Sequence, residues 1–585
     1  MDSPIGLVDG VTGATTTRFK VVLNEDAVLQ LDDIISCTTR CGDGREVTHY
    51  GIVVEVTAAL EGAKFASDTV RAMDGSRPAE RATYADVQLM RSVPELWVPP
   101  APGTQVFRLS QTLPGYEKAL FLDQMGSPLP VGISQSGENV YMDTDFMTGK
   151  KGGHVSISGI SGVATKTSYA LFLLYMLMET QAGRNALGAS AGAARALVFN
   201  AKGEDLLHID RPNNRLADNP KALKQWEQLG VSNPGPFESV SLYAPAIPGM
   251  GIASNVGSRP SQEVPTFGWS MEEFIHKGLL PFCFTDANDR DNQLSFIVQK
   301  VRTELLRCAY PCRGRKGAVV LADPPRDCPT SWEKLIGQRR APRDPGDGQL
   351  VETLNDLVEF LESYIDGSSD APRAWTGSVA PGTQMAFIRR LYASIARLGQ
   401  LIGPGLAPIE MNRSVTVVDI HTLHDSAQRF VVGTLLEDIF AEKAKGGREP
   451  LRFVVIDELN KYAPRDGHSP IKDLLIDIAA RGRSMGLILL GAQQSAVSVE
   501  ETVFKNAAIK IVGRLDAGEA SEYKFLTQEV RERATRFLPG TMIINQPLIP
   551  APLPFTFPFP GFATNPEEAT QKLTAAEEDA LLAKL

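Results

Sequence analysis

The chain has 585 residues with a formal net charge of −10, and 43% of the residues are hydrophobic while 22% are charged. These values exclude a single small binding module, a disordered chain and a fibrous protein, because a chain of this length and ordinary composition folds around several cores. The negative charge also excludes a surface that attracts polyanions everywhere, although it leaves room for a local basic channel.

Neither a membrane span nor an oxidising compartment is indicated. The longest apolar run, residues 170–178, is much shorter than the roughly 20 residues that cross a bilayer. The chain opens on a polar, acidic stretch without the pattern of a signal peptide. The cysteines are too sparse for a disulfide framework and lack the spacing of a zinc site. We therefore expect a cytoplasmic protein with buried, reduced thiols and no membrane partner.

Residues 1–115 contain short apolar or alternating segments, such as 19–23 and 51–56, separated by Gly, Asp and Pro turns. This pattern predicts a small β-barrel, whose strands alternate between inside and outside and are joined by tight turns. The proline-rich stretch 99–103 marks its end, because proline cannot continue a helix or a central strand. We interpret residues 116–150 as a linker.

From residue 154 the pattern changes to short apolar strands that alternate with helices, which is typical of a parallel sheet covered on both faces. The strand candidates are residues 154–158, 195–200, 415–420, 452–457, 486–491, 508–512 and 541–545. The stretch between the second and third candidates is too long for one crossover. We therefore expect an α/β core in two parts, 151–210 and 411–546, with an inserted subdomain at 211–410.

The insertion and the end of the chain have their own patterns. Two apolar stripes at helical spacing, Leu350 to Ile365 and Met385 to Ile402, predict a largely helical insertion. In the segment 547–585, recurring prolines between Leu and Phe predict an extended apolar strap that is neither helix nor β-ladder. Asn565 then opens a short acidic helix, with a capping residue, a proline and carboxylates in its first turn.

A candidate phosphate-binding loop joins the first core strand to a long apolar helix. Its glycines turn backbone N–H groups toward an anion, its lysine reaches the β- and γ-phosphates, and a hydroxyl holds Mg²⁺. We assign Mg²⁺ to Thr167. The residues assigned to ATP are Gly159, Gly162, Thr165, Lys166, Thr167 and Ser168. The loop is one residue longer than GxxxxGK[ST], so taken alone a structural strand-to-helix turn explains it equally well.

Paired carboxylates, Asp457 and Glu458, lie at the end of the strand candidate 452–457. Adjacent carboxylates at the end of a parallel strand are costly unless they have a task. In ATP hydrolysis Asp457 would hold the Mg²⁺ shell through water, and Glu458 would orient or deprotonate the attacking water. A surface turn is the alternative, and a preceding phosphate loop weakens it.

Three further candidates follow a helix that starts at Ser469. This helix ends near Arg481 and Arg483, and the next strand leads to Gln493. An amide at a strand end can sense the γ-phosphate or the attacking water, and a ring arginine can reach the neighbouring subunit's nucleotide. A solvated helix end is the alternative for each arginine.

These motifs together resemble the HerA branch of the HerA/FtsK ATPases. The resemblance is carried by residues 154–159, 415–420, 454–458, 482–487 and 499–506, and residues 50–53 and 93–98 are similar to the family's HAS barrel. It implies a RecA-like P-loop NTPase core, a hexameric ring, ATP and Mg²⁺ as cofactors, and double-stranded DNA as a partner. Three departures bear on hydrolysis, namely the lengthened phosphate loop, Asn200 in place of Asp, and Gln494 where the family often has Arg.

The first functional hypothesis is a ring-forming Mg²⁺-dependent ATPase that moves along double-stranded DNA with a separate nuclease or other effector, as in bacterial antiphage defence. Basic residues that would face its channel, or else an ordinary solvated surface, are Arg313, Arg315, Lys316, Lys461 and Arg465. The alternative is a scaffold ring that hydrolyses ATP weakly and assembles an effector. The lengthened loop favours the scaffold, whereas Asp457, Glu458 and Arg483 favour the motor. ATPase turnover with and without duplex DNA separates the two.

Overall fold

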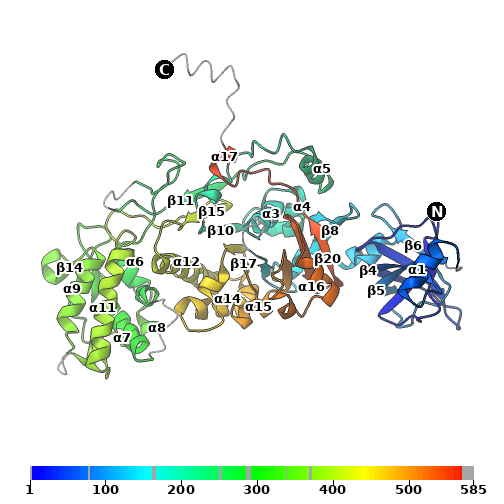
Figure 1. Ribbon diagram of the computed structural model, residues 1–585. Helices are drawn as coiled ribbons and strands as arrows, with labels where there is room; N and C mark the ends of the chain where they lie inside the picture. Colours follow the sequence, from blue (N-terminus) through cyan, green and yellow to red (C-terminus); the bar gives the residue numbers. More distant parts are fainter. Residues whose placement is uncertain are drawn as a thin grey trace, which may run out of the picture.

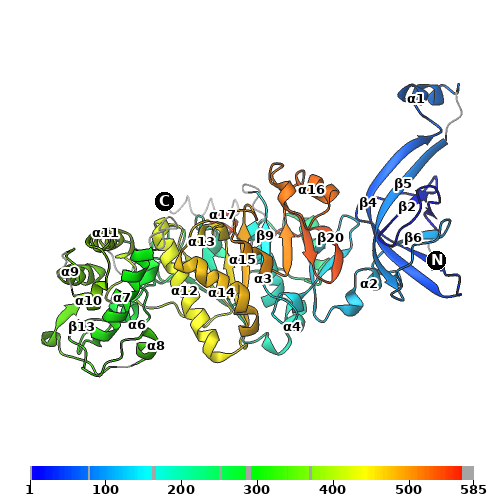
Figure 2. The ribbon, with the colours of Figure 1, turned by 90° about the horizontal axis from the view of Figure 1, so that it is seen from below.

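Three parts follow one another along the molecule: a closed β-barrel, a large sheet covered by helices, and a mainly helical subdomain (Figure 1, Figure 2). The computed structural model describes residues 3–76, 80–160, 166–248, 253–284, 292–338, 340–367 and 372–569. The sheet lies between the barrel and the helical subdomain, so its two edges have different neighbours.

The N-terminal part is the predicted barrel, closed in the order β1-β2-β5-β4-β3-β6. Its strands are β1 (Gly6–Val8), β2 (Arg18–Leu23), β3 (Ile34–Arg40), β4 (Glu46–Glu61), β5 (Glu80–Val93) and β6 (Gln105–Leu109). Burial alternates along β2, where Phe19, Val21 and Leu23 point inward. The fold class predicted for this region is therefore confirmed.

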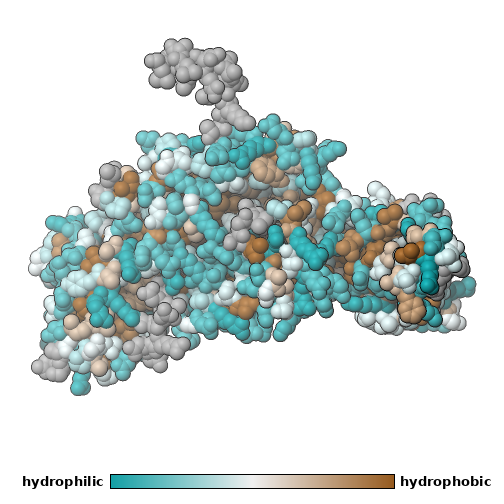
Figure 3. Space-filling view, viewed as in Figure 1, coloured by the Kyte–Doolittle hydropathy of each residue, from teal (hydrophilic) through white to brown (hydrophobic). Residues whose placement is uncertain are grey.

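An arm extends from the barrel, because β4 and β5 continue past it and carry α1 (Ala66–Met73) at their far end (Figure 2). The side chains of Phe65, Val70 and Met73 are exposed at this end. Figure 3 shows hydrophobic residues gathered on the visible face of the barrel. The arm thus presents apolar groups well away from the core.

The core sheet has the order β11-β15-β10-β16-β17-β9-β18-β19-β20-β7-β8, and the strands from β11 to β18 run parallel. The strands are β7 (Pro128–Ile133), β8 (Asn139–Asp143), β9 (Val155–Ser158), β10 (Arg195–Asn200), β11 (Val240–Tyr243), β15 (Val415–Asp419), β16 (Arg452–Ile456), β17 (Leu487–Gln493), β18 (Ile509–Val512), β19 (Thr541–Gln546) and β20 (Ile549–Thr556). Every predicted core strand is present, with ends that differ by no more than two residues. The predicted RecA-like α/β core is confirmed.

Helices cover both faces of the sheet, which explains why its central strands are apolar throughout. α3 (Lys166–Met178) and α4 (Gln181–Leu187) pack on one face, and α12 (Asp425–Gly446) and α14 (Pro470–Met485) pack on the other. Successive residues of β10 enter opposite layers, since Val198 joins the layer of α3 and Phe199 joins that of α12.

Shorter helices connect the core elements. They are α2 (Tyr116–Ala119), α13 (Leu459–Tyr462), α15 (Glu501–Asn506), α16 (Gln528–Ala534) and α17 (Pro566–Ala569), with 3₁₀ turns at Leu122–Gln124, Thr144–Phe146, Gly188–Ser190, Asp205–His208 and Ala520–Glu522. None of the helices in the described part of the chain is long and apolar enough to span a membrane.

Residues 116–150 differ from the expected linker, because they contain α2 and the strands β7 and β8. β7 pairs with β8 along its length and with β20 at Ile133. These residues therefore extend the core sheet on the side that faces the barrel. Both strands are short, and β7 contains two prolines and a glycine, which hides it from a local pattern.

The proline-rich segment also differs from prediction, because part of it is the strand β20 and forms a ladder with β19. Its prolines at 550, 552 and 554 occupy every second position. Alternate residues of a strand present their N–H groups to the same edge, so the missing donors fall on one side only. The other side pairs with β19, and toward β7 only Thr556 pairs. The predicted helix follows, with the Asn565 Oδ1 atom accepting from the Glu568 N–H at 3.0 Å.

The insertion is largely helical, as predicted. Its elements are α5 (Pro220–Gln228), α6 (Met271–His276), η5 (Leu280–Cys283), α7 (Asn292–Cys308), β12 (Ala309–Pro311), β13 (Val319–Leu321), α8 (Trp332–Leu335), a 3₁₀ turn at Pro345–Asp347, β14 (Gln349–Val351), α9 (Leu354–Tyr364), α10 (Arg373–Thr376) and α11 (Pro381–Leu398). The first predicted stripe begins too early, because Leu350 lies in β14, which pairs with β13. β11 belongs to the core sheet, where it pairs with β15.

An ion pair joins the barrel to the core. The two terminal nitrogens of Arg533 on α16 donate to the Asp32 carboxylate at 2.9 and 2.5 Å. Asp32 is only 9% exposed, and burial raises the pKa of its carboxyl group in spite of the guanidinium. The arginine therefore replaces hydration that the carboxylate loses, and the pair fixes the barrel against α16.

Replacing Arg533 with Ala should loosen this junction, because it leaves a buried carboxylate without its partner. We expect the free energy of unfolding to fall by about 1–3 kcal/mol in denaturant titrations. The double variant Asp32→Asn, Arg533→Ala should recover part of the loss, since Asn is neutral and tolerates the left-handed backbone of residue 32 (φ 69°). Equal losses in the single and double variants would contradict this account.

Candidate nucleotide-binding site

The candidate site lies where parallel strands of the core end. β9 leads into Gly159 and Ile160, whose N–H groups donate to the carbonyls of Gln493 at 3.2 Å and Arg514 at 2.9 Å. Residues 161–165, which include the predicted Gly162 and Thr165, lie outside the described residues. α3 then begins at Lys166. The structure thus contains the predicted strand and helix on either side of the loop.

Thr167, in the first turn of α3, contacts the carboxylate that follows β16. Its Oγ1 atom donates to Asp457 Oδ2 at 2.9 Å, across the intervening strand β17. A hydroxyl and a carboxylate at this separation are oxygen donors of the kind that Mg²⁺ prefers. The two residues predicted for the metal are therefore brought together.

Lys166 is buried, and its Nζ atom has no hydrogen-bond partner within the described part of the chain. Burial lowers the pKa of this ammonium group, and Lys202 adds to the effect, while Asp457 and Glu458 oppose it. An unpaired buried cation is unfavourable unless an anion binds to it. The geometry at the start of α3 thus indicates a site for a multiply charged anion.

Glu458 has a strained backbone at the start of α13. Its φ of 53° lies in the left-handed region that residues with a side chain rarely adopt, and its N–H donates to Asp457 Oδ1 at 2.8 Å. Two donors reach its Oε1 atom, the Lys202 ammonium at 3.0 Å and the Gln494 amide at 3.3 Å. The carboxylate is therefore held at the edge of the cleft.

Lys202 is a site residue that the sequence analysis did not assign. It follows β10, the strand beside β16, and its Nζ atom also lies 3.2 Å from Asp457 Oδ2. Burial opposes its charge, but Asp457 and Glu458 together raise the pKa of its ammonium group. A lysine after one core strand and carboxylates after another would predict an ion pair. Such a prediction can be made only when the two strands are known to lie side by side in the sheet.

Lys166, Thr167, Lys202 and Asp457 line a cleft of about 400 Å³. Thr564 and Asn565, from the segment after β20, complete it. The volume falls in the usual range for a small-molecule site. Ser168, predicted to contact ATP, belongs to the same cleft.

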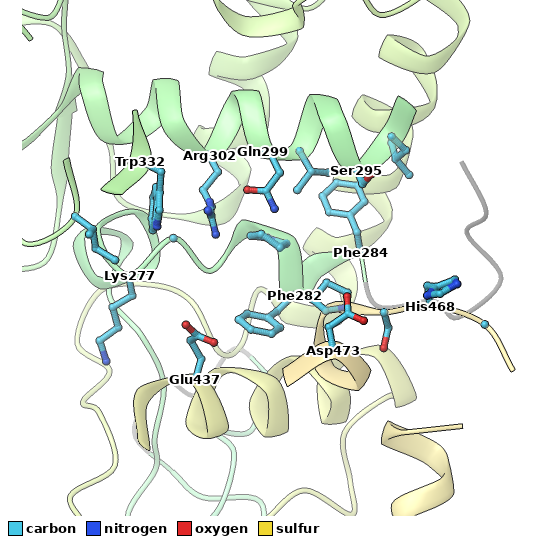
Figure 4. Close-up of a pocket in the computed structure, with 18 of the residues that line it drawn as sticks. Lys277, Phe282, Phe284, Ser295, Gln299, Arg302, Trp332, Glu437, His468 and Asp473 are labelled. Carbon is cyan, nitrogen blue, oxygen red and sulfur yellow. The ribbon is translucent and has the colours of Figure 1, made fainter. Parts of the chain in front are cut away.

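A larger cleft of about 920 Å³ lies elsewhere, between the insertion and the core (Figure 4). The Arg302 guanidinium stacks on the ring of Trp332, 3.8 Å from its centroid, and Glu437 of α12 lies across the cleft. None of the predicted site residues lines it. Choosing the cleft with the greater volume would therefore assign the nucleotide to the wrong place. We assign it to the smaller cleft beside Lys166.

The structure separates the two glutamines at the end of β17. Gln493 is buried, and its Nε2 atom donates to Ser156 and Ser158 of β9 at 2.6 and 2.8 Å. Gln494 is exposed and contacts Glu458. Gln493, the predicted sensor, therefore links β17 to β9. Its neighbour Gln494 is the glutamine that contacts one of the paired carboxylates, Glu458.

Neither predicted arginine joins the site of its own chain. Arg481 is exposed, pairs with Asp477 at 2.9 Å and lies over the ring of Phe440. Arg483 is also exposed, and its backbone packs so closely on Gly149 that a Cβ there would lie 2.5 Å from the Arg483 carbonyl. Arg483 also lies beside Gly153, at the amino end of β9, whereas the phosphate loop follows the carboxyl end.

Three of the basic residues considered for a channel have acidic partners. Arg313 pairs with Asp344 at 2.9 Å, Arg315 with Glu352 at 2.8 Å, and Lys461 with Asp425 at 2.6 Å. Lys316 and Arg465 are exposed. Surface ion pairs of this kind are weak, so they leave each cation open to a stronger anionic partner.

No protein-family model matches the chain, and no curated protein is significantly similar to it in sequence. Solved structures are similar in part. VirB4 of Thermoanaerobacter pseudethanolicus has a TM-score of 0.42 and 13% identity, over 76% of this chain and 99% of that chain. The bacterial conjugative coupling protein TrwBdeltaN70 has a TM-score of 0.43 and 12% identity, over 76% and 92%.

A third similar structure is the genome packaging NTPase B204 from Sulfolobus turreted icosahedral virus 2, in complex with ATP-gammaS. Its TM-score is 0.20, with 16% identity over 25% of this chain and 68% of that chain. Scores and identities this low leave the function to be argued from the residues of the site. The chain does have the architecture expected from its sequence, a closed N-terminal barrel joined to a largely parallel sheet that is covered by helices.

Replacing Lys166 with Met should change nucleotide affinity and the stability of the nucleotide-free protein in opposite directions. Nucleotide affinity should fall by about 10- to 100-fold, because one charge-assisted contact to phosphate is lost. The melting temperature of the nucleotide-free protein should rise, since burial disfavours the ammonium and the change removes it. Fluorescent-nucleotide titration and thermal unfolding measure the two effects. Unchanged affinity would remove the phosphate-site assignment.

Proposed function

We propose that this chain is a ring-forming, hexameric ATPase that hydrolyses ATP with Mg²⁺ and moves along double-stranded DNA together with a separate nuclease or other effector. The observation that carries the ATPase part is the buried ammonium of Lys166, which has no partner among the described residues and lies beside the Thr167–Asp457 pair and Glu458. The HerA/FtsK resemblance supports the ring, the DNA and a role in antiphage defence.

The chain's own groups divide the work of hydrolysis among them. Lys166 binds the β- and γ-phosphates, and the start of α3 directs backbone N–H groups toward them. Thr167 and Asp457 supply the oxygen ligands for Mg²⁺, which when bound neutralises charge that develops on the phosphates. Glu458 orients the attacking water and takes its proton once its carboxylate is free. Gln494 holds that carboxylate in place.

The position of Arg483 supports a shared site between subunits. Arg483 is exposed, and its Cβ and Cγ atoms lie beside Gly153 at the amino end of β9, so we expect it to serve a phosphate on an adjacent copy of the chain. An arginine supplied from a neighbour stabilises the transition-state charge and makes hydrolysis depend on assembly. Arg481, already paired with Asp477, is the second candidate for this role.

The alternative is a scaffold ring that binds nucleotide, turns it over slowly and assembles an effector. One observation favours slow turnover, namely that the Lys202 ammonium pairs with the Glu458 carboxylate at 3.0 Å. The decisive experiment measures ATPase turnover of the assembled protein with and without duplex DNA. Stimulation by DNA supports the motor, and slow, DNA-independent turnover supports the scaffold.

Replacing Glu458 with Gln should preserve nucleotide binding and lower turnover by about 10²- to 10⁴-fold, because the amide has the same shape but cannot accept the proton of water. Steady-state ATPase assays and nucleotide titration measure both. The matched control is Glu501→Gln, at an exposed carboxylate on α15 that pairs only with Lys505 and should leave turnover unchanged. Normal turnover in Glu458→Gln would assign the base to another residue.

Rings that mix two inactive variants test the shared site. Glu458→Gln and Arg483→Ala should each be inactive alone, because one lacks the base and the other lacks the arginine that stabilises charge. Co-assembled rings should regain part of the activity, since some interfaces then pair an intact Glu458 with an intact Arg483. Inactive mixed rings of confirmed stoichiometry, or full activity of Arg483→Ala alone, would exclude Arg483 from this role.

A further inference from the structure

We propose that Lys202 is a tethered cation that holds Asp457 and Glu458 in a resting arrangement and competes with Mg²⁺ for them. Turnover then begins only when Mg²⁺ and nucleotide displace its ammonium group from the carboxylates. The inference rests on the proposed function, because it concerns how the same site is regulated.

The first observation is that one ammonium group bridges both carboxylates. The Nζ atom of Lys202 lies 3.2 Å from Asp457 Oδ2 and 3.0 Å from Glu458 Oε1. Asp457 Oδ2 is also the atom that accepts from Thr167. The ammonium therefore stands beside the oxygen atoms that a bound Mg²⁺ and its water shell need, and it supplies positive charge there in the metal's place.

The second observation is that the segment carrying Lys202 is held from two sides. Asn200 Nδ2 donates to the Gly203 carbonyl at 2.7 Å and to the buried Asp419 carboxylate at 2.8 Å. The Glu204 carboxylate accepts from the N–H groups of Gly257 at 2.7 Å and Ser258 at 2.8 Å. The position of Lys202 between these anchors is thus set by the fold, and Asn200, a departure from the family pattern, is one of the anchors.

The third observation is that this arrangement opposes catalysis. A general base must accept a proton from water, but the Glu458 carboxylate is paired through Oε1 with the Lys202 ammonium at 3.0 Å. Lys202 also disfavours the charge on the nearby buried ammonium group of Lys166. Bound phosphate would relieve that repulsion, and Asp457 and Glu458 would be free to hold Mg²⁺ and its water shell once the ammonium group of Lys202 moves away. The side chain of Lys202 is 49% exposed, so it has room to move away.

The competing role for Lys202 is a direct contact to the γ-phosphate, and the two roles predict opposite changes. If Lys202 competes with Mg²⁺, removing its charge makes Mg²⁺-dependent nucleotide binding easier. If Lys202 binds phosphate, removing its charge makes binding weaker. A purely structural lysine changes neither when a side chain of similar length replaces it.

The experiment uses the full chain with the variants Lys202→Met and Lys202→Arg, and with Lys224→Met on the exposed surface of α5 as control. A fluorescent ATP analogue is titrated at rising Mg²⁺ concentrations. Lys202→Met should reach half-maximal binding at about threefold less Mg²⁺, because a half-exposed ion pair is a modest competitor. Lys202→Arg and Lys224→Met should stay close to the unaltered chain.

A second measurement needs no nucleotide. Mg²⁺ alone should raise the melting temperature of Lys202→Met more than that of the unaltered chain, because the carboxylates then lack their tethered cation. An unchanged Mg²⁺ midpoint, or weaker binding in Lys202→Met, overturns the inference. The proposed function fails separately, if the unaltered chain binds no nucleotide or if Lys166→Met binds it equally well.

Discussion

The hydrogen bond between Thr167 and Asp457 links the two halves of the site, and the rest of the core is arranged so that it can form. The two residues are 290 positions apart in the chain and follow strands that are separated by β17. Their meeting depends on a parallel sheet, whose strands all end at one edge. Two layers of helices bury that sheet, and their packing stabilises the edge at which Lys166 is buried without a partner among the residues that the structure describes.

The same constraint explains what the sequence could predict. Core strands such as β10 and β16 are apolar on both faces, so their positions and ends follow from a local pattern. β7 and β20 do not show this signal, because their prolines interrupt the usual pattern of a strand and suit only one edge of a ladder, and because the contact between β7 and β20 joins segments far apart in the chain. The hydrophobic pattern of the sequence therefore predicts the central strands of the sheet but not the strands β7 and β20 near its edge.

Some residues of the candidate site can be recognised from sequence motifs, whereas others can be recognised only from the order of the strands in the sheet. Lys166, Thr167, Asp457 and Glu458 lie in segments whose composition marks them, and the structure brings them together. Lys202 carries no such mark, because its role follows from β10 lying beside β16. The different positions of the two glutamines follow from the length of β17. Successive residues of a strand point in opposite directions, and because β17 continues through Gln493, that side chain points toward β9. The role of Lys202 follows from the order of the strands, and the positions of the glutamines follow from the length of β17. Local sequence determines neither the strand order nor the strand length.

The contact between Lys202 and Glu458 bears on the choice between a motor and a scaffold. A ring whose base is held by a cation of its own chain hydrolyses ATP slowly at rest, whichever function it serves. Slow basal turnover therefore does not separate the two hypotheses. What differs is whether an event elsewhere in the ring can move the segment that carries Lys202. Asp419, which holds Asn200 in that segment, ends β15, and β15 pairs with β11, the edge strand of the core sheet from which the chain continues into the insertion. A displacement of the insertion is thus connected through two strands to the cation that restrains Glu458, which is the coupling that a motor requires and a passive scaffold does not.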